Sequence, residues 1–261
     1  MEVVITSETG QAGRIGAQIV TDLIRKRPDA VLGLATGSSP VAIYDELGRL
    51  VQAGELSLAH ARGFMLDEYV GLPEQHPECY RSVIERDFVA KVDIESSNVH
   101  GPDGSSNDIQ AACAAYEKAI AEAGGVDVQF LGIGSDGHVA FNEPGSSLAS
   151  RTRIKTLTAQ TRADNARFFG GDVEAVPQHC ITQGIGTIME ARHLLLIASG
   201  EGKAEAIHHL VEGPISARWP ATILQMHPHV TVLLDPSAAG RLEHVGYYEQ
   251  TYAAKPDWQR F

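Results

Sequence analysis

The chain has 261 residues, of which 43% are hydrophobic and 21% charged, a composition typical of a globular domain and not of a disordered chain. Asp and Glu number 33 against 21 Lys and Arg, so the formal net charge is −12, which excludes the basic surface that general nucleic-acid binding needs. No apolar run approaches the ~18 residues of a membrane helix, and the first residues lack a signal-peptide pattern, so we expect a cytoplasmic protein without membrane or nucleic-acid partners.

Strand-like and helix-like segments alternate along the chain. Buried strands are predicted, in chain order, at Val3–Thr6, Ala30–Ala35, Gly63–Leu66, Val126–Ile133, His193–Ala198 and Val230–Leu234. Helical periodicity predicts helices at Gly13–Lys26, Val41–Val51, Asn107–Ala123 and Lys203–Val211. This alternation implies right-handed crossovers. We therefore expect a single α/β domain over residues 1–261, built on a mostly parallel open sheet with helices on both faces.

The segment from about residue 151 to 178 interrupts this rhythm. It is polar and carries Arg151, Arg153 and Lys155 near its start. We expect it to form a lid over a site. In an open α/β sheet, ligands bind beyond the carboxyl ends of the strands. The loops predicted to lie there are 36–40, 67–72, 134–147 and 199–203.

Two glycine patterns after predicted strands, Gly10–Gly16 and Gly132–Gly137, resemble dinucleotide-binding fingerprints. The first lacks the acidic residue about 20 positions later that would hold a ribose. The second is followed by Pro144 and Gly145, which would break the helix that such a site requires. Nucleotide-dependent redox chemistry is therefore disfavoured.

The densest group of reactive side chains is Asp136, His138 and Glu143, on a loop just after a buried strand. A histidine beside carboxylates suits acid–base work, because their charge orients the ring and raises its pKa. The same residues also fit a polar turn with satisfied side chains. A metal site is a further alternative, although no second histidine stands nearby in the sequence.

Three other loops contribute candidates. Asp67 ends a strand, so its carboxylate either points into the same cleft or caps a turn. Ser38 and Ser39 precede a helix, where backbone N–H groups and hydroxyls bind anions, although serine is also an ordinary loop residue. Lys203 would reach the same edge of the sheet and add a positive charge for a phosphate, unless it is a surface lysine.

These segments resemble the glucosamine-6-phosphate deaminases, of the glucosamine/galactosamine-6-phosphate isomerase family. The resemblance runs nearly end to end, weakens after about Asp235, and is carried by GLATGSSP, LDEYVGLP, GIGSDGHVAFNEPGSSLASRTRIKTLT, ASGEGKA, LQMH and VEG. It implies a modified Rossmann-like α/β fold. It also implies conversion of glucosamine 6-phosphate and water to fructose 6-phosphate and ammonia, with no metal, nucleotide or redox cofactor.

The resemblance assigns a role to each matching residue. Asp67 matches the base that moves the C2 proton, and His138 matches the ring-opening histidine, with Asp136 and Glu143 as its carboxylate partners. The positions that match the phosphate-binding residues are Ser38, Ser39, Arg167 and Lys203.

Some members of the family also bind N-acetylglucosamine 6-phosphate at a regulatory site between the subunits of a hexamer. The matching positions are Ser146, Arg153, Lys155 and Thr156, with a tail contact near Tyr247. The resemblance therefore implies a homo-oligomer, hexameric if it is regulated. The divergent tail after Asp235 is where such a contact would have been lost.

Two other functions remain to be weighed. A 6-phosphogluconolactonase would share the fold and act on a similar phosphosugar, but it would not explain Asp67 together with the His138 group. A sugar-phosphate sensor of the repressor type would carry a DNA-binding segment, for which this chain has neither spare length nor a basic face.

Overall fold

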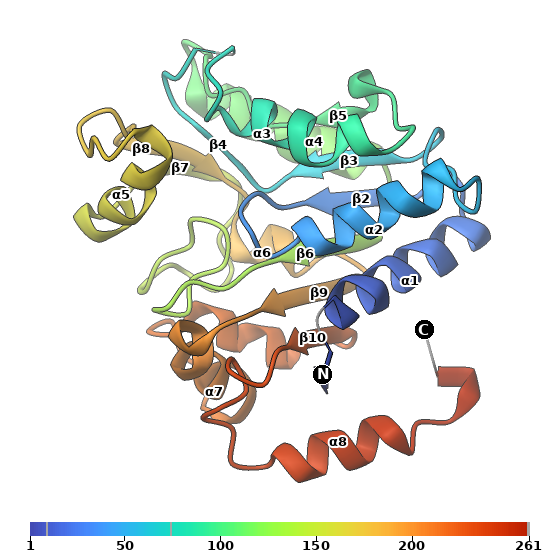
Figure 1. Ribbon diagram of the computed structural model, residues 1–261. Helices are drawn as coiled ribbons and strands as arrows, with labels where there is room; N and C mark the ends of the chain where they lie inside the picture. Colours follow the sequence, from blue (N-terminus) through green and yellow to red (C-terminus); the bar gives the residue numbers. More distant parts are fainter. Residues whose placement is uncertain (9, 74, 260–261) are drawn as a thin grey trace.

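A computed structural model describes residues 1–8, 10–73 and 75–259 (Figure 1). Its centre is a seven-stranded sheet in the order β1-β10-β9-β6-β2-β3-β5, in which every pair of neighbours is parallel. The strands are β1 (Glu2–Ile5), β2 (Val31–Leu34), β3 (Arg62–Met65), β5 (Val99–His100), β6 (Val128–Leu131), β9 (His193–Ala198) and β10 (Val230–Leu234).

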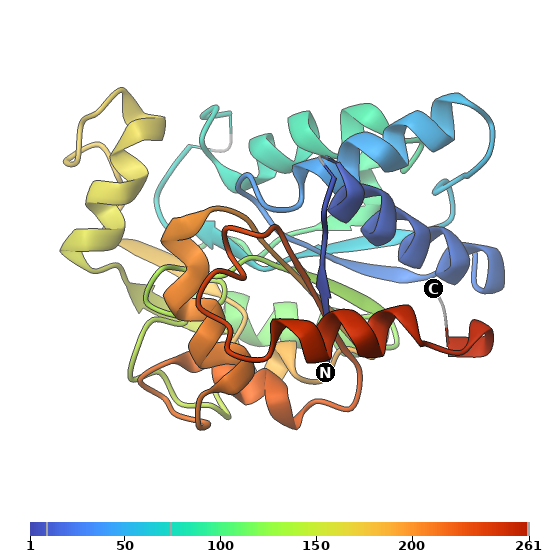
Figure 2. The ribbon, with the colours of Figure 1, turned by 60° about the horizontal axis from the view of Figure 1, so that its bottom comes forward.

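Helices cover both faces of this sheet (Figures 1 and 2). One face carries α1 (Gln11–Lys26), α2 (Val41–Gln52) and α3 (Tyr80–Asp87); the other carries α4 (Ile109–Glu122), α6 (Ile185–Ile188) and α7 (Ala204–Glu212). A last helix, α8 (Val245–Ala253), packs beside β1. In the described part of the chain, no helix is both long and apolar enough to span a membrane. The predicted α/β fold with a parallel sheet is confirmed.

The sequence dictates this layering directly. Strands β2, β9 and β10 are buried at every position, as expected for strands that have helices on both sides. Helix α1 packs closely on α2 through glycine: a Cβ added at Gly16 would lie 2.2 Å from Ile43 Cδ1. The absence of a side chain at Gly16 therefore sets how near the two helices come.

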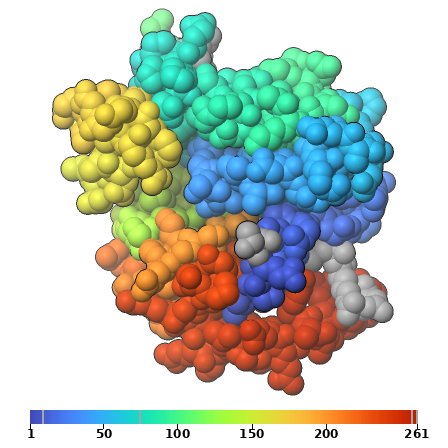
Figure 3. Space-filling model, viewed as in Figure 1, coloured from blue at the N-terminus to red at the C-terminus, as the bar shows by residue number. Residues whose placement is uncertain are grey.

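A second, smaller sheet stands apart from the first. Strands β4 (Asp67–Tyr69), β8 (His179–Thr182) and β7 (Arg153–Thr156) pair antiparallel in the order β4-β8-β7. Between β7 and β8 in the chain, α5 (Ala159–Asn165) and the 3₁₀ helix η3 (Ala166–Phe169) form the yellow lobe of Figure 3. The segment expected to be a lid thus contains a strand and a helix.

This lobe has its own apolar cluster, which sequence periodicity did not reveal. The buried residues of the cluster are Tyr69, Phe141, Leu157, Ala166, Val176 and Cys180. They come from four separate stretches of chain, so no single window of sequence displays them together. The cluster holds the lobe against β4 and against the loop that follows β6.

The order of the strands reverses between β2 and β6. From β2 the chain proceeds through β3 to β5 at one edge, whereas from β6 it proceeds through β9 to β10 near the other. The crevice outside the carboxyl ends of two such strands is the usual ligand site of an open α/β sheet. Here it lies between the loops that begin at Ala35 and at Gly132.

The predicted strands and helices are all present, with ends shifted by a few residues. Strands β9 and β10 match their predicted limits, whereas the helix expected from Asn107 begins at Ile109, because the side chain of Asp108 caps it by accepting from Ala111 N. Helices α3, α6 and α8 and strand β5 were not predicted. All of these are short, and α8 buries none of its residues.

The tight pairing of β2 with β6 gives a test of the packing. Gly33 lies opposite the fully buried Gln129, and a Cβ at Gly33 would lie 2.0 Å from Gln129 Oε1. We expect Gly33→Ala to lower the free energy of unfolding by about 1–3 kcal/mol or more through overpacking. Gly246→Ala in α8, where nothing lies within 4 Å, is the control and should be neutral or slightly stabilising. Urea unfolding measures both; an unchanged midpoint for Gly33→Ala would contradict the packing described.

Candidate active site

Four loops that were predicted to carry the site converge at one edge of the sheet. They follow β9, β6, β2 and β3, which are consecutive neighbours in the sheet. Their closeness shows at Gly132, where an added Cβ would lie 3.2 Å from Ser39 Oγ. The structure therefore places the predicted loops together at the switch point of the sheet.

Asp67 is the first residue of β4, directly beyond the end of β3, and only 6% of its surface is exposed. Burial, and secondly the charge of the adjacent Glu68, raise the pKa of Asp67 to about 8. A carboxyl group with such a pKa exchanges its proton near neutral pH. This is the property required of a group that takes a proton from carbon and returns it.

His138 and Asp136 form a close pair on the loop after β6. His138 Nδ1 lies 2.7 Å from Asp136 Oδ1, and the backbone N–H of His138 donates to the same oxygen at 3.2 Å. The contact with His138 holds the pKa of Asp136 below its usual range. The ring also lies flat against Gly134, where a Cβ would approach it to 2.3 Å. The histidine is thus oriented by a carboxylate and by the backbone beneath it.

Glu143, expected beside His138, is bonded instead to the lobe. Its Oε1 accepts from the hydroxyls of Thr161 at 2.5 Å and Thr158 at 3.3 Å, and from Thr158 N at 3.4 Å. No described residue donates to its Oε2. One oxygen of this buried carboxylate is therefore fixed, and the other is free of protein hydrogen bonds.

The turn before Glu143 has unusual backbone geometry. Ala140 has a φ of 50°, which a residue with a side chain adopts only under constraint. The constraint comes from the buried Asn142, whose Nδ2 donates to the carbonyls of Val139 at 3.0 Å and Gln183 at 2.9 Å. Asn142 therefore fixes the path of the chain into Glu143.

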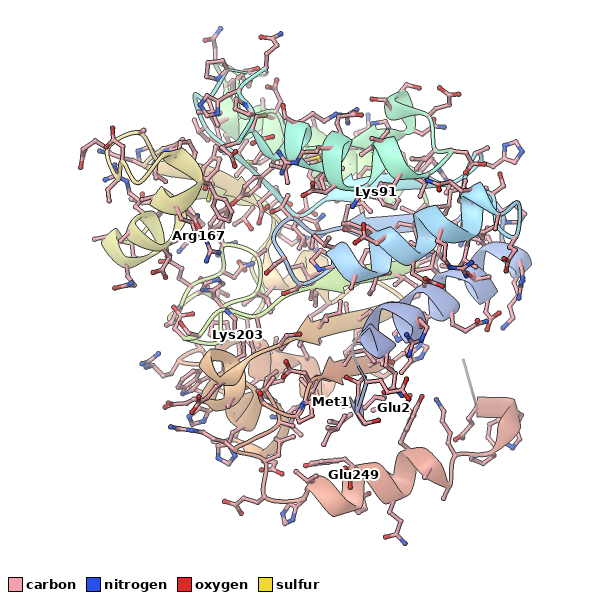
Figure 4. All side chains as sticks on the ribbon, in the orientation of Figure 1. Met1, Glu2, Lys91, Arg167, Lys203 and Glu249 are labelled. Carbon is pink, nitrogen blue, oxygen red and sulfur yellow. The ribbon has the colours of Figure 1, made fainter. Side chains whose placement is uncertain are left out.

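The expected phosphate-binding residues come from three separate segments of the chain. Ser38 is exposed and Ser39 half-buried, just before α2. Lys203 ends the 3₁₀ helix η4 (Glu201–Lys203), and Arg167 lies on the lobe, its guanidinium 4.6 Å from the ring centre of Phe168. Figure 4 shows Lys203 and Arg167 on the same side of the molecule, one below and one above the loop after β6.

Electrostatics support this grouping. Burial lowers the pKa of Lys203, Asp136 acts in the opposite direction, and the positive charge of Arg167 adds to the lowering. The pKa of Lys203 therefore depends both on Asp136 of the histidine–carboxylate pair and on Arg167 of the lobe. Two cations whose charges interact beside Asp136 are chemically suited to binding an anion.

The residues expected to form a regulatory site are only partly brought together. Ser146 is buried, and its hydroxyl has no partner among the described residues. Arg153 and Lys155 share one face of β7, whereas Thr156, by strand alternation, faces the other way and contacts His179 Nδ1 at 3.3 Å.

Tyr247 lies far from these residues. It is 64% exposed on α8, on a different side of the molecule from β7 (Figures 1 and 2). Within one chain it therefore does not complete the expected regulatory site.

Sequence reasoning missed several residues that support the site. Thr158 has a recognisable local signal, because it is the N-cap of α5. Trp219 has none: a Cβ at Gly137 would lie 2.6 Å from its ring, and Ala221 N donates to the Gly137 carbonyl at 2.9 Å. A segment about 80 residues away thus braces the His138 loop. Among residues 1–8, 10–73 and 75–259, no group of three or more His, Cys, Asp or Glu side chains is placed to hold a metal ion.

The fold is that of a Rossmann-like α/β protein in which Asp67 and the His138–Asp136 pair lie beyond the carboxyl ends of the strands beside the switch point. The sequence model of the family described as "Glucosamine-6-phosphate isomerases/6-phosphogluconolactonase" matches residues 9–233. The chain belongs to this family.

Individual relatives agree with this assignment. A glucosamine-6-phosphate deaminase of Mycolicibacterium smegmatis is 68% identical over 99% of both chains, and one of Streptomyces avermitilis is 56% identical over the same shares. A solved structure described as a monomeric glucosamine-6-phosphate deaminase is 42% identical, with a TM-score of 0.89 over 92% of this chain and 100% of that one. A 6-phosphogluconolactonase of Trypanosoma cruzi, at 21% identity over 93% of this chain and 97% of that one, with a TM-score of 0.72, shares the fold.

The raised pKa of Asp67 predicts an unusual dependence of stability on pH. Because the folded state raises this pKa from 3.8 to about 8, its stabilising contribution is complete below pH ~4 and is lost as the pH rises through 8. We expect Asp67→Asn, which cannot ionise, to raise the Tm by about 4 °C or more at pH 8–9 and by little at pH 4.

Asp136→Asn is the matched control in the same calorimetric series. The pKa of Asp136 is lowered, so its ionised form contributes stability that is lost on acidification. This variant should be destabilised at neutral pH. A pH-independent Tm difference between wild type and Asp67→Asn would show that Asp67 is ionised normally in the folded protein.

Proposed function

We propose that the protein is a glucosamine-6-phosphate deaminase, which converts glucosamine 6-phosphate and water to fructose 6-phosphate and ammonia in the cytoplasm. The observation that carries the proposal is the pairing of two proton-transfer groups at one crevice: the buried Asp67 and the His138–Asp136 pair. The names of relatives up to 68% identical over 99% of the chain support the same reaction.

Ring opening is the first step of the proposed mechanism. His138 removes the proton from the O1 hydroxyl and delivers one to the ring oxygen as the C1–O5 bond breaks, leaving an open-chain aldehyde. Asp136 stabilises the protonated imidazole, which forms transiently. Glu143, whose Oε2 accepts no hydrogen bond from the described residues, is the second carboxylate that the family resemblance pairs with this histidine.

Asp67 carries out the second step. It takes the proton from C2 and returns it to C1, while O1 gains a proton and the nitrogen loses one, so that the aldehyde becomes an alcohol and the C2 amine becomes an imine. Water then adds to the imine carbon, and ammonia leaves as the C2 ketone forms. The pKa of Asp67, raised to about 8, keeps the energies of its acid and base forms close enough for both transfers.

The phosphate of the substrate is held away from the reacting carbons. Lys203 and Arg167 supply the charges, and Ser38 and Ser39 supply hydroxyls at the start of α2. Because Arg167 belongs to the segment 151–178, that segment is proposed to act as a lid whose arginine contacts the bound phosphate.

The decisive experiment is product analysis. Wild-type protein incubated with glucosamine 6-phosphate should release ammonia and fructose 6-phosphate in equal amounts, and Asp67→Asn should not. Parallel incubation with 6-phosphogluconolactone measures the alternative reaction of the family. Lactone hydrolysis without ammonia release would overturn the proposal, and tight phosphosugar binding without any turnover would favour a sensor.

We also propose that N-acetylglucosamine 6-phosphate activates the enzyme at Ser146, Arg153 and Lys155, and that the active form is a homo-oligomer. Arg153 Nη1 donates to Asn142 Oδ1 at 2.9 Å, one residue from Glu143, so an anion bound by Arg153 would act directly on the catalytic loop. Tyr247 would have to come from a second copy, as would any backbone contact near it. Thr156 would contribute through its backbone. The hexamer known in the family is the assembly we propose for this regulated form.

For the phosphate position, we expect Lys203→Ala to raise KM about tenfold or more while changing kcat much less. The contact is remote from C1 and C2, so it acts on ground and transition states alike, and a charge-assisted hydrogen bond is worth about 1.5–3 kcal/mol. Steady-state kinetics measure both constants. Lys118→Ala removes an exposed lysine of α4 and should change neither. A normal KM with a collapsed kcat would place Lys203 in the chemistry instead.

For regulation, we expect the activator to lower the apparent KM of the wild type by a coupling of about 1–3 kcal/mol, and Lys155→Ala to abolish this effect with basal turnover intact. Light scattering beside the kinetics reports the oligomeric state. A monomer with hyperbolic kinetics that ignores the activator, in keeping with the related structure described as monomeric, would contradict the regulatory proposal.

A further inference from the structure

Glu68, the neighbour of Asp67, has an unusually complete set of partners. Its Oε1 accepts from the backbone N–H groups of Tyr69 at 2.8 Å and Tyr80 at 2.9 Å. Its Oε2 accepts from Arg81 N at 2.9 Å and from Cys79 Sγ at 3.1 Å. The side chain is buried, with 7% of the residue exposed.

These partners fix both the place and the charge of the carboxylate. Two of the N–H groups are the first of helix α3, where the helix dipole favours a negative charge. Hydrogen bonds from backbone N–H groups to a carboxylate stabilise its ionised form. Glu68 is therefore a buried carboxylate held in place by four hydrogen bonds.

Strand β4 directs the two acidic residues to opposite sides. Consecutive side chains of a strand alternate between faces, so Glu68 points to α3 while Asp67 points away from it, to the crevice. The strand has only three residues, and its partner β8 places Thr182 opposite Asp67 and Ile181 opposite Glu68. So short a strand depends on side-chain anchors: Glu68 joins it to the first N–H groups of α3, beside the contact of Tyr69 with Tyr80.

We propose that Glu68 is a positioning residue for the reaction: by locking β4 onto the start of α3, it presents Asp67 to the substrate, and its fixed negative charge makes Asp67 a stronger base. The inference rests on the proposed function, which assigns the proton transfer to Asp67. Glu68 itself does not contact the substrate. The alternative is that Glu68 only stabilises the fold, as an N-terminal ligand of α3.

Two substitutions separate charge from position. Glu68→Gln keeps the length of the side chain and removes the charge, whereas Glu68→Asp keeps the charge but is too short to reach α3. Glu85→Gln is the matched control, because it removes a carboxylate from the same helix, where Glu85 pairs with Arg81 on the side facing solvent. Each full-length variant is assayed for ammonia release across pH 5–10.

For Glu68→Gln we expect the fall of kcat/KM on acidification, which we call the acidic limb, to occur at a pH lower by about 0.5–1 unit than in the wild type. The reason is that the charge that repels ionised Asp67 has been removed. Its plateau kcat should fall about tenfold or more, with KM within about twofold of wild type, because the phosphate contacts are untouched. For Glu68→Asp we expect the fall in kcat without the shift of the limb. Glu85→Gln should match the wild type.

A stability measurement tests the same coupling without any turnover. Asp67→Asn should raise the Tm at pH 8–9 less in the Glu68→Gln background than in the wild type, because the repulsion is already gone. An unmoved acidic limb together with additive Tm changes would overturn the inference, leaving Glu68 as a structural cap. If Glu68→Gln does not fold, wild-type kcat in Glu68→Asp would overturn it equally. Failure of the proposed function itself would appear separately, as a wild type that releases no ammonia.

Discussion

The site depends on the reversal of strand order between β2 and β6 in the parallel sheet. One buried carboxylate holds the strands together at this point. Asp127 accepts from Arg27 at 2.8 Å, from Arg192 at 3.0 Å and from Val31 N at 2.8 Å. These residues precede or begin β2, β6 and β9, so the amino ends of all three strands are tied to one point. The removal of one partner from such a buried pair is costly, because it leaves an unpaired charge. With the amino ends fixed, the loops at the carboxyl ends must diverge, and the crevice is the space they leave.

Within the crevice, burial and neighbouring charge give two carboxyl groups opposite properties. Asp67 lies in a dry position beside another carboxylate, so its pKa is raised to about 8. Asp136 lies beside a histidine, so its pKa is lowered. In the proposed mechanism, the first group exchanges a proton with carbon, while the second remains charged and stabilises an imidazolium. When the environments of two titrating groups shift their pKa values in opposite directions, the group with the raised pKa is suited to act as the base. The group with the lowered pKa is suited to act as the electrostatic partner.

The parts of this arrangement that sequence predicted are those set by local pattern. Strands such as β9 are continuous apolar runs, and Asp67, His138 and Lys203 each follow one, so the rule for ligand sites in open sheets was enough to group them. The small sheet was not predicted, because β7 is a half-exposed strand of four residues whose partner lies beyond a helix. The engagement of Glu143 with Thr161, and the brace that Trp219 provides to Gly137, join residues far apart in the chain. Such contacts depend on tertiary packing and have no local signal.

The lobe is hydrogen-bonded both to β4 and to the loop that follows β6. Its position therefore affects the placement of residues in both segments. Asn165 donates to the Tyr69 hydroxyl at 3.0 Å, two residues beyond Asp67. On the other side, Thr161 donates to Glu143 Oε1 at 2.5 Å, while Oε2 accepts no bond from the described residues. A displacement of the lobe therefore moves one oxygen of Glu143 directly and carries the other with it. Since Arg167 lies on the same lobe, the position of its side chain and that of the Glu143 carboxylate are coupled through one attachment.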